Sequence, residues 1–216
     1  MQSKIQVILA DDHPVVRMGL SQMLVNRLDM VVVGEAGGVG DLLRLVSVLP
    51  FDVVITDFYM PDPTLTDGLS LIRRLRRTMT EDQHIVVLTM LDNLAFVDQM
   101  IEAGASAVLN KHDPLEEVIE AILQAARGDT YLSSGIRSAR LSQGNRNVPS
   151  QWSALSPRES EVIRLYLTGM SVTTIAQQVH RSVKTISQQK KSAMEKLGAP
   201  NDVVLFQLAK EGGMIG

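Results

Sequence analysis

The stretch KIQVILADD, residues 4–12, decides the fold, because an apolar run there ends in two adjacent carboxylates. A second run, DVVITD at residues 52–57, also ends in a carboxylate, that of Asp57. Short runs rich in Val and Ile are typical of buried parallel strands. Five such runs occur in the first 110 residues, and helical segments are expected between them at roughly 14–27, 40–48, 67–77, 93–104 and 114–127. The alternation predicts an α/β, doubly wound, five-stranded parallel sheet with helices on both faces.

Two further strand ends carry groups that can bind phosphate. Ile85–Leu88 runs into Thr89, and Ala107–Leu109 is followed two positions later by Lys111. Ligands of an open parallel sheet bind beyond the carboxyl ends of its strands. We therefore expect the carboxylates, the hydroxyl and the ammonium to share one crevice.

Such a crevice favours phosphoryl transfer. The carboxylates of Asp11, Asp12 and Asp57 would repel one another unless a cation neutralised them, and Mg²⁺ accepts carboxylates, water and phosphate as ligands. One Asp could then attack phosphorus, while Thr89 and Lys111 bind the phosphoryl oxygens. Taken singly, each group has a simpler interpretation: an Asp after a strand is usually a turn residue, and Asp12 before His13-Pro14 fits a helix N-cap. The convergence of all of them favours function.

The first part of the chain, about 125 residues, resembles a response-regulator receiver domain, which has a flavodoxin-like fold. The matching residues are Asp11-Asp12, Asp57 to Pro61, Asp67-Gly68, Thr89, and Gly104 to Lys111. The resemblance implies that Asp57 is the phosphoacceptor and that Thr89 and Lys111 hold the phosphoryl group. It also implies that Asp12, Asp57 and the backbone carbonyl of Tyr59 ligate Mg²⁺, with Asp11 assisting through water.

Three departures from the receiver pattern concern signalling more than chemistry. The position three before the Lys is usually aromatic but is Val108 here, and the residue after the Lys is usually Pro but is His112. An insertion, residues 62–66, lengthens the loop before Asp67. A receiver that acts through partner binding, largely independently of phosphorylation, therefore stays open as an alternative.

Composition and charge fit a two-part regulator. The chain has 216 residues and a net charge of −3, but residues 1–150 carry 13 Lys/Arg against 19 Asp/Glu, and residues 151–216 carry 8 against 5. A basic second half favours a polyanionic partner. The absence of cysteine excludes disulfides and thiolate metal sites. No apolar run approaches about 20 residues and no signal peptide is evident, so we expect a bacterial cytoplasmic protein without membrane contact.

Residues 128–150 lose helical periodicity and are rich in Ser, Gly, Asn and Arg, which is typical of a linker. They separate an expected receiver domain, 1–127, from an all-α domain, 151–216. In the all-α domain, Ser156-Pro157-Arg158-Glu159 predicts a capping box and a first helix ending near Gly169. Three more helices are expected from about 172 to 179, from 183 to 197, and after 202.

The helix expected at 183–197 has two faces. Its apolar stripe contains Val183, Ile186, Ala193, Met194 and Leu197, and its polar stripe contains Lys184, Ser187, Gln188 and Lys191. A polar stripe is usually only solvated. A short preceding helix and turn, however, make a helix-turn-helix, which can enter a major groove, where Gln can bond adenine and Lys can bond guanine.

Residues 152–210 resemble the LuxR-type helix-turn-helix domain of the NarL/FixJ regulators, and the matching landmarks are Leu155 to Glu159, Thr185-Ile186 and Lys196-Leu197-Gly198. The stretch from Arg181 to Met194, together with Val108 and the insertion after Pro61, is most similar to the RcsB branch of that family. The resemblance implies that Ser187, Gln188 and Lys191 face bases and that Lys184 and Lys190 meet DNA phosphates. Lys190 lies close to the apolar stripe, so it would have to extend past apolar neighbours to reach DNA.

Together, these patterns and the two resemblances predict a transcriptional regulator controlled by phosphorylation of Asp57, which binds double-stranded DNA as a dimer. The resemblances imply that the dimer is a homodimer or a heterodimer with a related regulator, and that the phosphodonor is a sensor histidine kinase or a histidine phosphotransfer protein. We do not expect a dedicated enzyme, although the receiver would support its own phosphotransfer and dephosphorylation. A phosphohydrolase of the haloacid-dehalogenase type also uses Asp, Thr and Lys. It carries a second Asp two residues after its nucleophile, where this chain has Tyr59.

Overall fold

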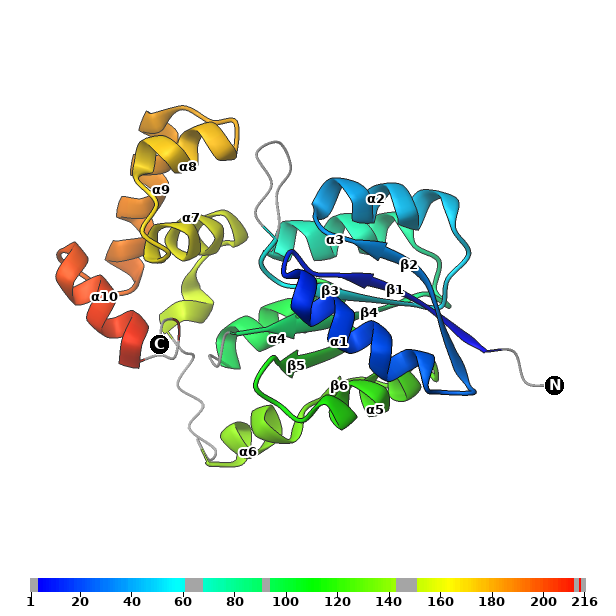
Figure 1. Ribbon diagram of the computed structural model, residues 1–216. Coiled ribbons are helices and arrows are strands. Elements are labelled where there is room, and N and C mark those ends of the chain that lie inside the picture. Colours follow the sequence, from blue (N-terminus) through cyan, green and yellow to red (C-terminus); the bar gives the residue numbers. More distant parts are fainter. Residues whose placement is uncertain (1–3, 61–67, 91–93, 143–150, 212–213, 215–216) are drawn as a thin grey trace.

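The computed structural model describes residues 4–60, 68–90, 94–142, 151–211 and 214. The first half is a parallel sheet whose strands lie in the order β2-β1-β3-β4-β5-β6 (Figure 1). The strands are β1 (Ile5–Ala10), β2 (Met30–Ala36), β3 (Val53–Asp57), β4 (His84–Thr89), β5 (Ala107–Asn110) and β6 (Tyr131–Leu132). Every residue of β3 is buried, as expected for a strand covered on both faces. The predicted doubly wound architecture is confirmed.

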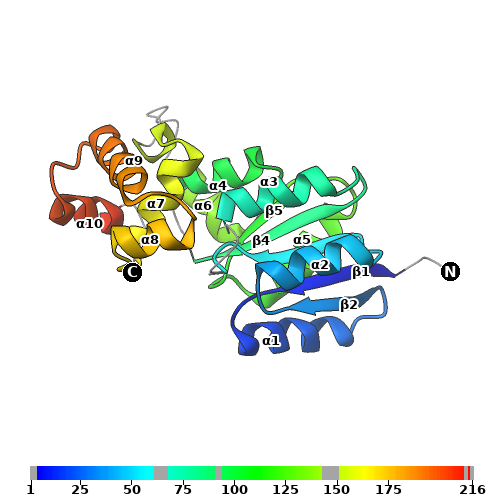
Figure 2. The same cartoon turned by 90° about the horizontal axis from the view of Figure 1, so that it is seen from above.

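Helices cover both faces of the sheet (Figures 1 and 2). The helices α1 (Pro14–Val25) and α5 (Leu115–Ala125) share one apolar cluster with the strands. The helices α2 (Val39–Val48), α3 (Gly68–Thr78) and α4 (Leu94–Glu102) share another on the opposite face. All five helices begin and end within a few residues of the predicted bounds.

The sixth strand corrects the expectation of five. It belongs to residues 128–150, the stretch that we interpreted as a linker, and it pairs in parallel with β5. A further helix, α6 (Ser134–Ser142), follows it and contacts α4 and β5. Glu117 on α5 anchors this segment, because its carboxylate accepts hydrogen bonds from the Tyr131 hydroxyl at 2.9 Å and from the Ser134 N–H at 2.7 Å. The first part of the expected linker is therefore folded onto the sheet, and residues 143–150 lie outside the described residues.

The second half contains the four predicted helices, preceded by a short 3₁₀ helix, η1 (Gln151–Ala154). They are α7 (Pro157–Leu167), α8 (Val172–Gln178), α9 (Val183–Lys196) and α10 (Asp202–Glu211). The predicted capping box is confirmed, with the Ser156 side chain and the Glu159 side chain each bonding the other's backbone N–H. Serines also cap α8 and α9, at Ser171 and Ser182. None of the helices in the described ranges is both long and apolar enough to cross a bilayer.

The two halves pack against each other. The helix α7 contacts α3, and η1 contacts α4. Trp152, Leu155 and Leu167 belong to the same apolar cluster as Phe58 and Phe96 of the sheet domain. Figure 2 shows the helical domain beside the end of the sheet domain where α3 and α4 lie. An apolar interface of this kind gives the two domains a defined docked arrangement.

Candidate functional site

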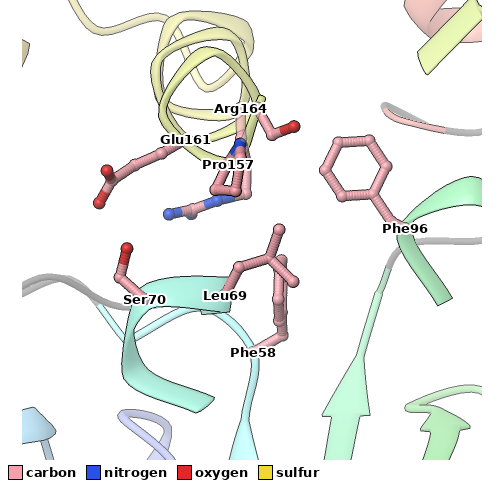
Figure 3. Close-up of a pocket in the computed structure, with 8 residues that line it drawn as sticks. Phe58, Leu69, Ser70, Phe96, Pro157, Glu161 and Arg164 are labelled. Atoms are coloured by element: carbon pink, nitrogen blue, oxygen red, sulfur yellow. The ribbon is translucent and has the colours of Figure 1, made fainter. Parts of the chain in front are cut away.

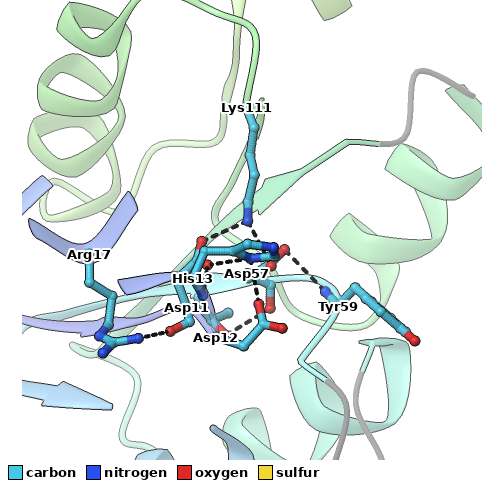
Figure 4. A network of polar contacts seen from close by, with 8 residues as sticks. Asp11, Asp12, His13, Arg17, Asp57, Tyr59 and Lys111 are labelled. Carbon is cyan, nitrogen blue, oxygen red and sulfur yellow. Dashed lines mark hydrogen bonds and ion pairs between the residues drawn. The ribbon is translucent and has the colours of Figure 1, made fainter. Parts of the chain in front are cut away.

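The structure brings the predicted strand-end groups together at one edge of the sheet (Figure 4). Asp11 follows β1, Asp57 ends β3, and Thr89 ends β4; all three side chains are buried. Lys111 follows β5, and its backbone N–H donates to the Thr89 carbonyl at 2.8 Å. The parallel register therefore places groups that lie far apart in the chain on one small surface.

Lys111 connects two of the carboxylates. Its Nζ lies 2.7 Å from Oδ2 of Asp11 and 2.7 Å from Oδ2 of Asp57. Burial disfavours the ammonium charge, but the hydrogen bonds to Asp11 and Asp57 outweigh burial and raise the pKa of Lys111. Lys111 therefore stays charged and offsets part of the repulsion between the carboxylates.

Asp57 has the environment of a reactive carboxyl group. Burial raises its pKa to about 6; Lys111 and the Tyr59 N–H oppose the rise, and the charge of Asp11 adds to it. The Tyr59 N–H donates to Oδ1 of Asp57 at 3.2 Å. A pKa shifted by desolvation and by named charges is typical of functional sites.

The start of α1 differs from the alternative in which Asp12 caps that helix. His13 occupies the N-cap position and makes no side-chain cap bond. Oδ1 of Asp11 instead accepts the His13 N–H at 2.8 Å, so Asp11 makes the turn and Asp12 keeps its carboxylate for other contacts. The imidazole of His13, which the sequence did not single out, lies 2.8 Å from Oδ1 of Asp12.

The donor set fits a hard divalent cation. Ligand atoms of Asp11, Asp12, His13 and Asp57 all lie within 4.8 Å of one another. The buried Oδ1 of Asp12 receives no well-aligned hydrogen bond within the described part of the chain. Several carboxylate oxygens that converge on one point, one of them without such a bond, match what Mg²⁺ requires.

The residues that depart from the receiver pattern have clear positions. Val108 is fully buried in β5 and pairs with Leu132 of β6. Its side chain lies in the apolar cluster on the sheet face that α2, α3 and α4 cover. The N–H of His112 donates to Oδ1 of Asn110 at 2.8 Å, which continues the chain into the turn before α5. The insertion at 62–66 and Asp67 lie outside the described residues.

On α9, the structure divides the predicted DNA-binding residues into two groups. Lys184, Ser187, Gln188 and Lys191 are exposed. The Lys190 side chain is 15% exposed, forms an ion pair with Oδ1 of Asp202 at 2.6 Å, and lies 3.6 Å from the centroid of the Tyr166 ring. Lys190 thus points toward α7 and α10 and does not share the exposed face.

The apolar stripe of α9 is also narrower than predicted. Ile186, Ala193 and Leu197 are buried, but Val183 is 47% exposed because it stands at the first position of the helix. The buried residues and Lys190 together fix the side of α9 that faces its own domain. The opposite side is left to solvent.

A cavity of about 220 Å³ adjoins Asp57 and has walls from both domains. Thr89, Lys111 and Tyr59 line it from the sheet domain, and Arg164 and Leu167 line it from α7. The sequence did not predict the α7 residues in this place. Helical periodicity marks Leu167 only as a core residue, and nothing local indicates which domain it contacts.

Comparisons with known proteins agree with this geometry. Residues 7–123 match the family described as response regulator receiver domain, and residues 153–209 match bacterial regulatory proteins of the luxR family. The chain belongs to the response regulators. This response regulator is 35% identical over 206 residues to the transcriptional regulatory protein RcsB of Escherichia coli K12, covering 94% of this chain and 93% of RcsB. It is 33% identical over 213 residues to the response regulator GacA of Pseudomonas aeruginosa PAO1, covering 98% of each.

Solved structures of RcsB share the whole architecture of this response regulator. A structure of Salmonella typhimurium RcsB superposes with a TM-score of 0.83 at 33% identity, covering 98% of this chain and 99% of that one. RcsB from Salmonella enterica serovar Typhimurium, bound to the promoter rprA with the phosphomimetic BeF₃⁻, gives a TM-score of 0.79 at 35% identity, covering 96% and 99%. The similarity spans both domains, so it supports the family and its RcsB branch together.

Proposed function

We propose that this response regulator is a transcription factor controlled by phosphorylation of Asp57. The observation that carries the proposal is the position of Lys111, 2.7 Å from Asp57, beside carboxylates that can hold a divalent cation. Receptors for phosphate need opposite charge close to the acceptor, and the exposed face of α9 supplies a separate site for DNA. The receiver domain is taken as residues 1–127, extended by β6 and α6, and the DNA-binding domain as residues 151–216.

The phosphoryl group would move to Asp57 from a histidine. A carboxylate oxygen of Asp57 forms the new P–O bond as the P–N bond of the donor breaks, and the imidazole leaves with its electron pair. Lys111 neutralises charge on the phosphoryl oxygens, and the Thr89 hydroxyl, at the end of the adjacent strand, lies beside the same cavity. Asp11, Asp12, Asp57 and the backbone carbonyl of Tyr59 would hold Mg²⁺, which lowers the repulsion between the donor and the acceptor when bound.

Phosphorylation would then bias the chain toward a dimer that binds promoters. Lys111 and Thr89 move toward the phosphoryl group and shift a two-state surface near β4 and β5. Because position 108 is Val, this surface lacks the aromatic side chain that receivers usually use as a switch. The partner would be a second copy or a related regulator, and the donor a sensor histidine kinase or a histidine phosphotransfer protein of the bacterial cytoplasm.

On DNA, α9 would enter the major groove. Ser187, Gln188 and Lys191 are proposed to face bases, and Lys184 to meet phosphate. Lys190 would support this face indirectly, since its contacts with Tyr166 and Asp202 hold α9 against its own domain.

Phosphoryl capture is tested by mass spectrometry after incubation with acetyl phosphate and Mg²⁺. We expect one acid-labile phosphoryl group on the full-length protein and none on Asp57→Asn or in the presence of a chelator. The matched control is Asp41→Asn, an exposed carboxylate on α2. Equal labelling of Asp57→Asn and wild type would reject Asp57 as the acceptor.

DNA binding is tested with a fragment of the rprA promoter, since the RcsB relative binds that promoter with BeF₃⁻. Phosphorylated wild type should bind more tightly than Asp57→Asn. The buried Val108 favours a second possibility, in which binding depends on a partner subunit and not on phosphate. Equal affinity of wild type and Asp57→Asn, raised in both by a related regulator, would support that alternative.

A further inference from the structure

The helical domain covers the phosphoacceptor crevice. The cavity of about 220 Å³ has a floor that includes Asp57 and Lys111 and a cover that includes Leu167, Thr168 and Met214 from the second domain. Arg164 and Thr168 are the polar residues among those that the second domain contributes to this lining. Both domains therefore shape the cavity beside Asp57 in the docked arrangement.

Arg164 on α7 contacts the residues that directly follow the phosphoacceptor Asp57. Its guanidinium carbon lies 4.7 Å from the centroid of the Tyr59 ring and 5.7 Å from that of Phe58, the two residues that follow Asp57. Figure 3 shows Arg164 between α7 and the receiver surface, above Phe58 and Leu69. Cation–π contacts of a buried arginine are stronger than exposed ones, because less water competes for the charge.

A second set of contacts holds the domains together at α4. The Ser160 hydroxyl donates to Oε1 of Gln99 at 3.4 Å, and Nε2 of Gln99 donates to the Trp152 carbonyl at 3.5 Å. The Trp152 side chain is 2% exposed and belongs to the apolar cluster that spans both domains. Both bonds are long, so the apolar contacts and Arg164 supply most of the attachment.

We propose that the docked DNA-binding domain determines which class of phosphodonor reaches Asp57: small acyl phosphates enter, and the phosphohistidine of a protein donor does not. The proposal rests on the proposed function of Asp57. A phosphohistidine that projects from a helix brings that helix with it, and a helix with its side chains is about 10–12 Å across. The cavity of about 220 Å³ accommodates a compound of a few heavy atoms but no turn of helix. A protein donor therefore requires undocking, and by reciprocity its binding promotes undocking.

DNA reading is not covered in the same way. Lys184, Ser187, Gln188 and Lys191 on α9 are exposed while α7 is docked. The docked arrangement thus separates two steps, because it restricts delivery of phosphate to Asp57 and leaves the proposed reading face open.

A reversible tether tests the proposal in the full-length protein. The chain contains no cysteine, so Gln99→Cys with Ser160→Cys introduces its only two thiols, at side chains already in contact. A short bis-maleimide with a reducible centre joins them and holds the domains docked. Labelling of Asp57 is followed by mass spectrometry with two phosphodonors. One is acetyl phosphate, and the other is a histidine phosphotransfer domain that carries phosphohistidine. The phosphotransfer domain is chosen as one that labels the protein once the tether has been cleaved.

With acetyl phosphate, the rate of Asp57 labelling in the tethered protein should be within about twofold of the rate in the cleaved protein. With the phosphotransfer domain, the tethered protein should be labelled at least about tenfold more slowly, because the fraction of undocked protein sets that rate. Reduction of the tether should restore the second rate. Equal transfer from the phosphotransfer domain before and after cleavage overturns the proposal, and so does loss of both reactions in the tethered form. If acetyl phosphate labels neither form at Asp57, the proposed function itself fails, which is a different result.

A single substitution gives an independent measurement. Arg164→Ala should loosen the cover and speed transfer from the phosphotransfer domain relative to acetyl phosphate, and Arg77→Ala, an exposed arginine on α3, should leave that ratio unchanged. The only tryptophan, Trp152, lies at the interface, so its fluorescence should shift to longer wavelength in Arg164→Ala as water reaches it. A solvent-exposed Trp152 in Arg164→Ala without any change in donor preference would overturn the proposal.

Discussion

The ammonium of Lys111 lies 2.7 Å from Oδ2 of Asp57. The two residues are 54 positions apart, and the parallel pairing of β4 with both β3 and β5 brings them together. Lys111 also contacts Asp11, so one cation is shared by two carboxylates. A phosphoryl group on Asp57 would compete for this ammonium and draw it away from Asp11.

Lys111→Ala should still accept phosphate from acetyl phosphate, more slowly, but should fail to dimerise when phosphorylated. The reason is that the variant lacks the side chain that moves in response to the new charge. Val108→Ala, which trims a buried side chain without removing charge, should perturb dimerisation only mildly. Sedimentation of the phosphorylated proteins measures both. Normal dimer formation by Lys111→Ala counts against this route.

Glu159→Gln should destabilise the DNA-binding domain by about 1–3 kcal/mol at neutral pH, since its carboxylate serves as a charged acceptor and as part of a cap. Burial disfavours the charge of Glu159, but Lys196, the Ser156 N–H and Ser192 outweigh burial and lower its pKa to about 2. Because the folded pKa is depressed, the stabilisation is complete above the ordinary value of 4.5 and is lost as the pH falls toward 2.

Urea unfolding of wild type and Glu159→Gln across this pH range checks the prediction. The difference between them should shrink as the pH falls below about 4.5. Glu195→Gln, an exposed residue on α9, is the control and should show no such trend. A difference that is independent of pH would show that Glu159 acts without its charge.

Lys184 and Lys190 should respond differently to alanine substitution. Lys184→Ala should weaken binding to all DNA sequences. It should also reduce the slope of log K against log salt concentration by roughly the amount expected for one phosphate contact. Lys190→Ala should lower the free energy of unfolding by about 0.5–2 kcal/mol, because it removes a cation–π contact and an ion pair, and should leave the slope unchanged. Titrations over a salt series separate the two. An equal loss of slope in Lys190→Ala at unchanged stability would mean that Lys190 contacts phosphate.

Gln188→Ala should cost about 1–3 kcal/mol on the preferred site and relax the preference at one base position. Lys191→Ala should do the same if its partner is a guanine. A dimer should also favour half-sites about one helical turn apart. Binding selections from random DNA measure all three. Unchanged base preferences in both variants would exclude α9 as the reading helix.

Gly104→Ala should destabilise the receiver domain by about 1–3 kcal/mol, the usual cost of a strained backbone. Gly104 has a φ of +111°, and an added Cβ would lie 2.8 Å from Cγ of Arg76. Arg76 cannot yield easily, because it donates to the Gln83 carbonyl at 2.7 Å. Gly19→Ala is the matched control: it lies in α1 with no atom within 4 Å of the new Cβ and should be neutral or stabilising. Thermal unfolding compares them.

Strand ends could be predicted from the sequence because buried parallel strands are continuous apolar runs, and each run leads into a polar residue that the sheet must place at one edge. Asp11, Asp57 and Lys111 follow from that rule. The strand β6 could not be predicted, since its two residues, Tyr131 and Leu132, form no run and depend on a long-range partner, Glu117.

Orientation within the second domain was partly predictable. The period of α9 identified Ile186 and Leu197 as buried, but Val183 is exposed because the helix begins there. The docking of α7 beside Asp57 could not be predicted from the sequence, because helical periodicity identifies an apolar face but not the domain that covers it. Arg164, a charged residue in an amphipathic helix, gave no sign of its contact with Tyr59.

Because α6 packs on the receiver domain, the linker between the two domains is short. Only residues 143–150 join α6 to η1, and a peptide of that length reaches at most about 30 Å, at 3.3–3.6 Å per residue. A released DNA-binding domain thus stays at an effective concentration of roughly millimolar near the surface that it left. A protein phosphodonor that binds the same surface must therefore compete with the tethered DNA-binding domain at this concentration. A donor with weak affinity for the receiver would be displaced by the DNA-binding domain.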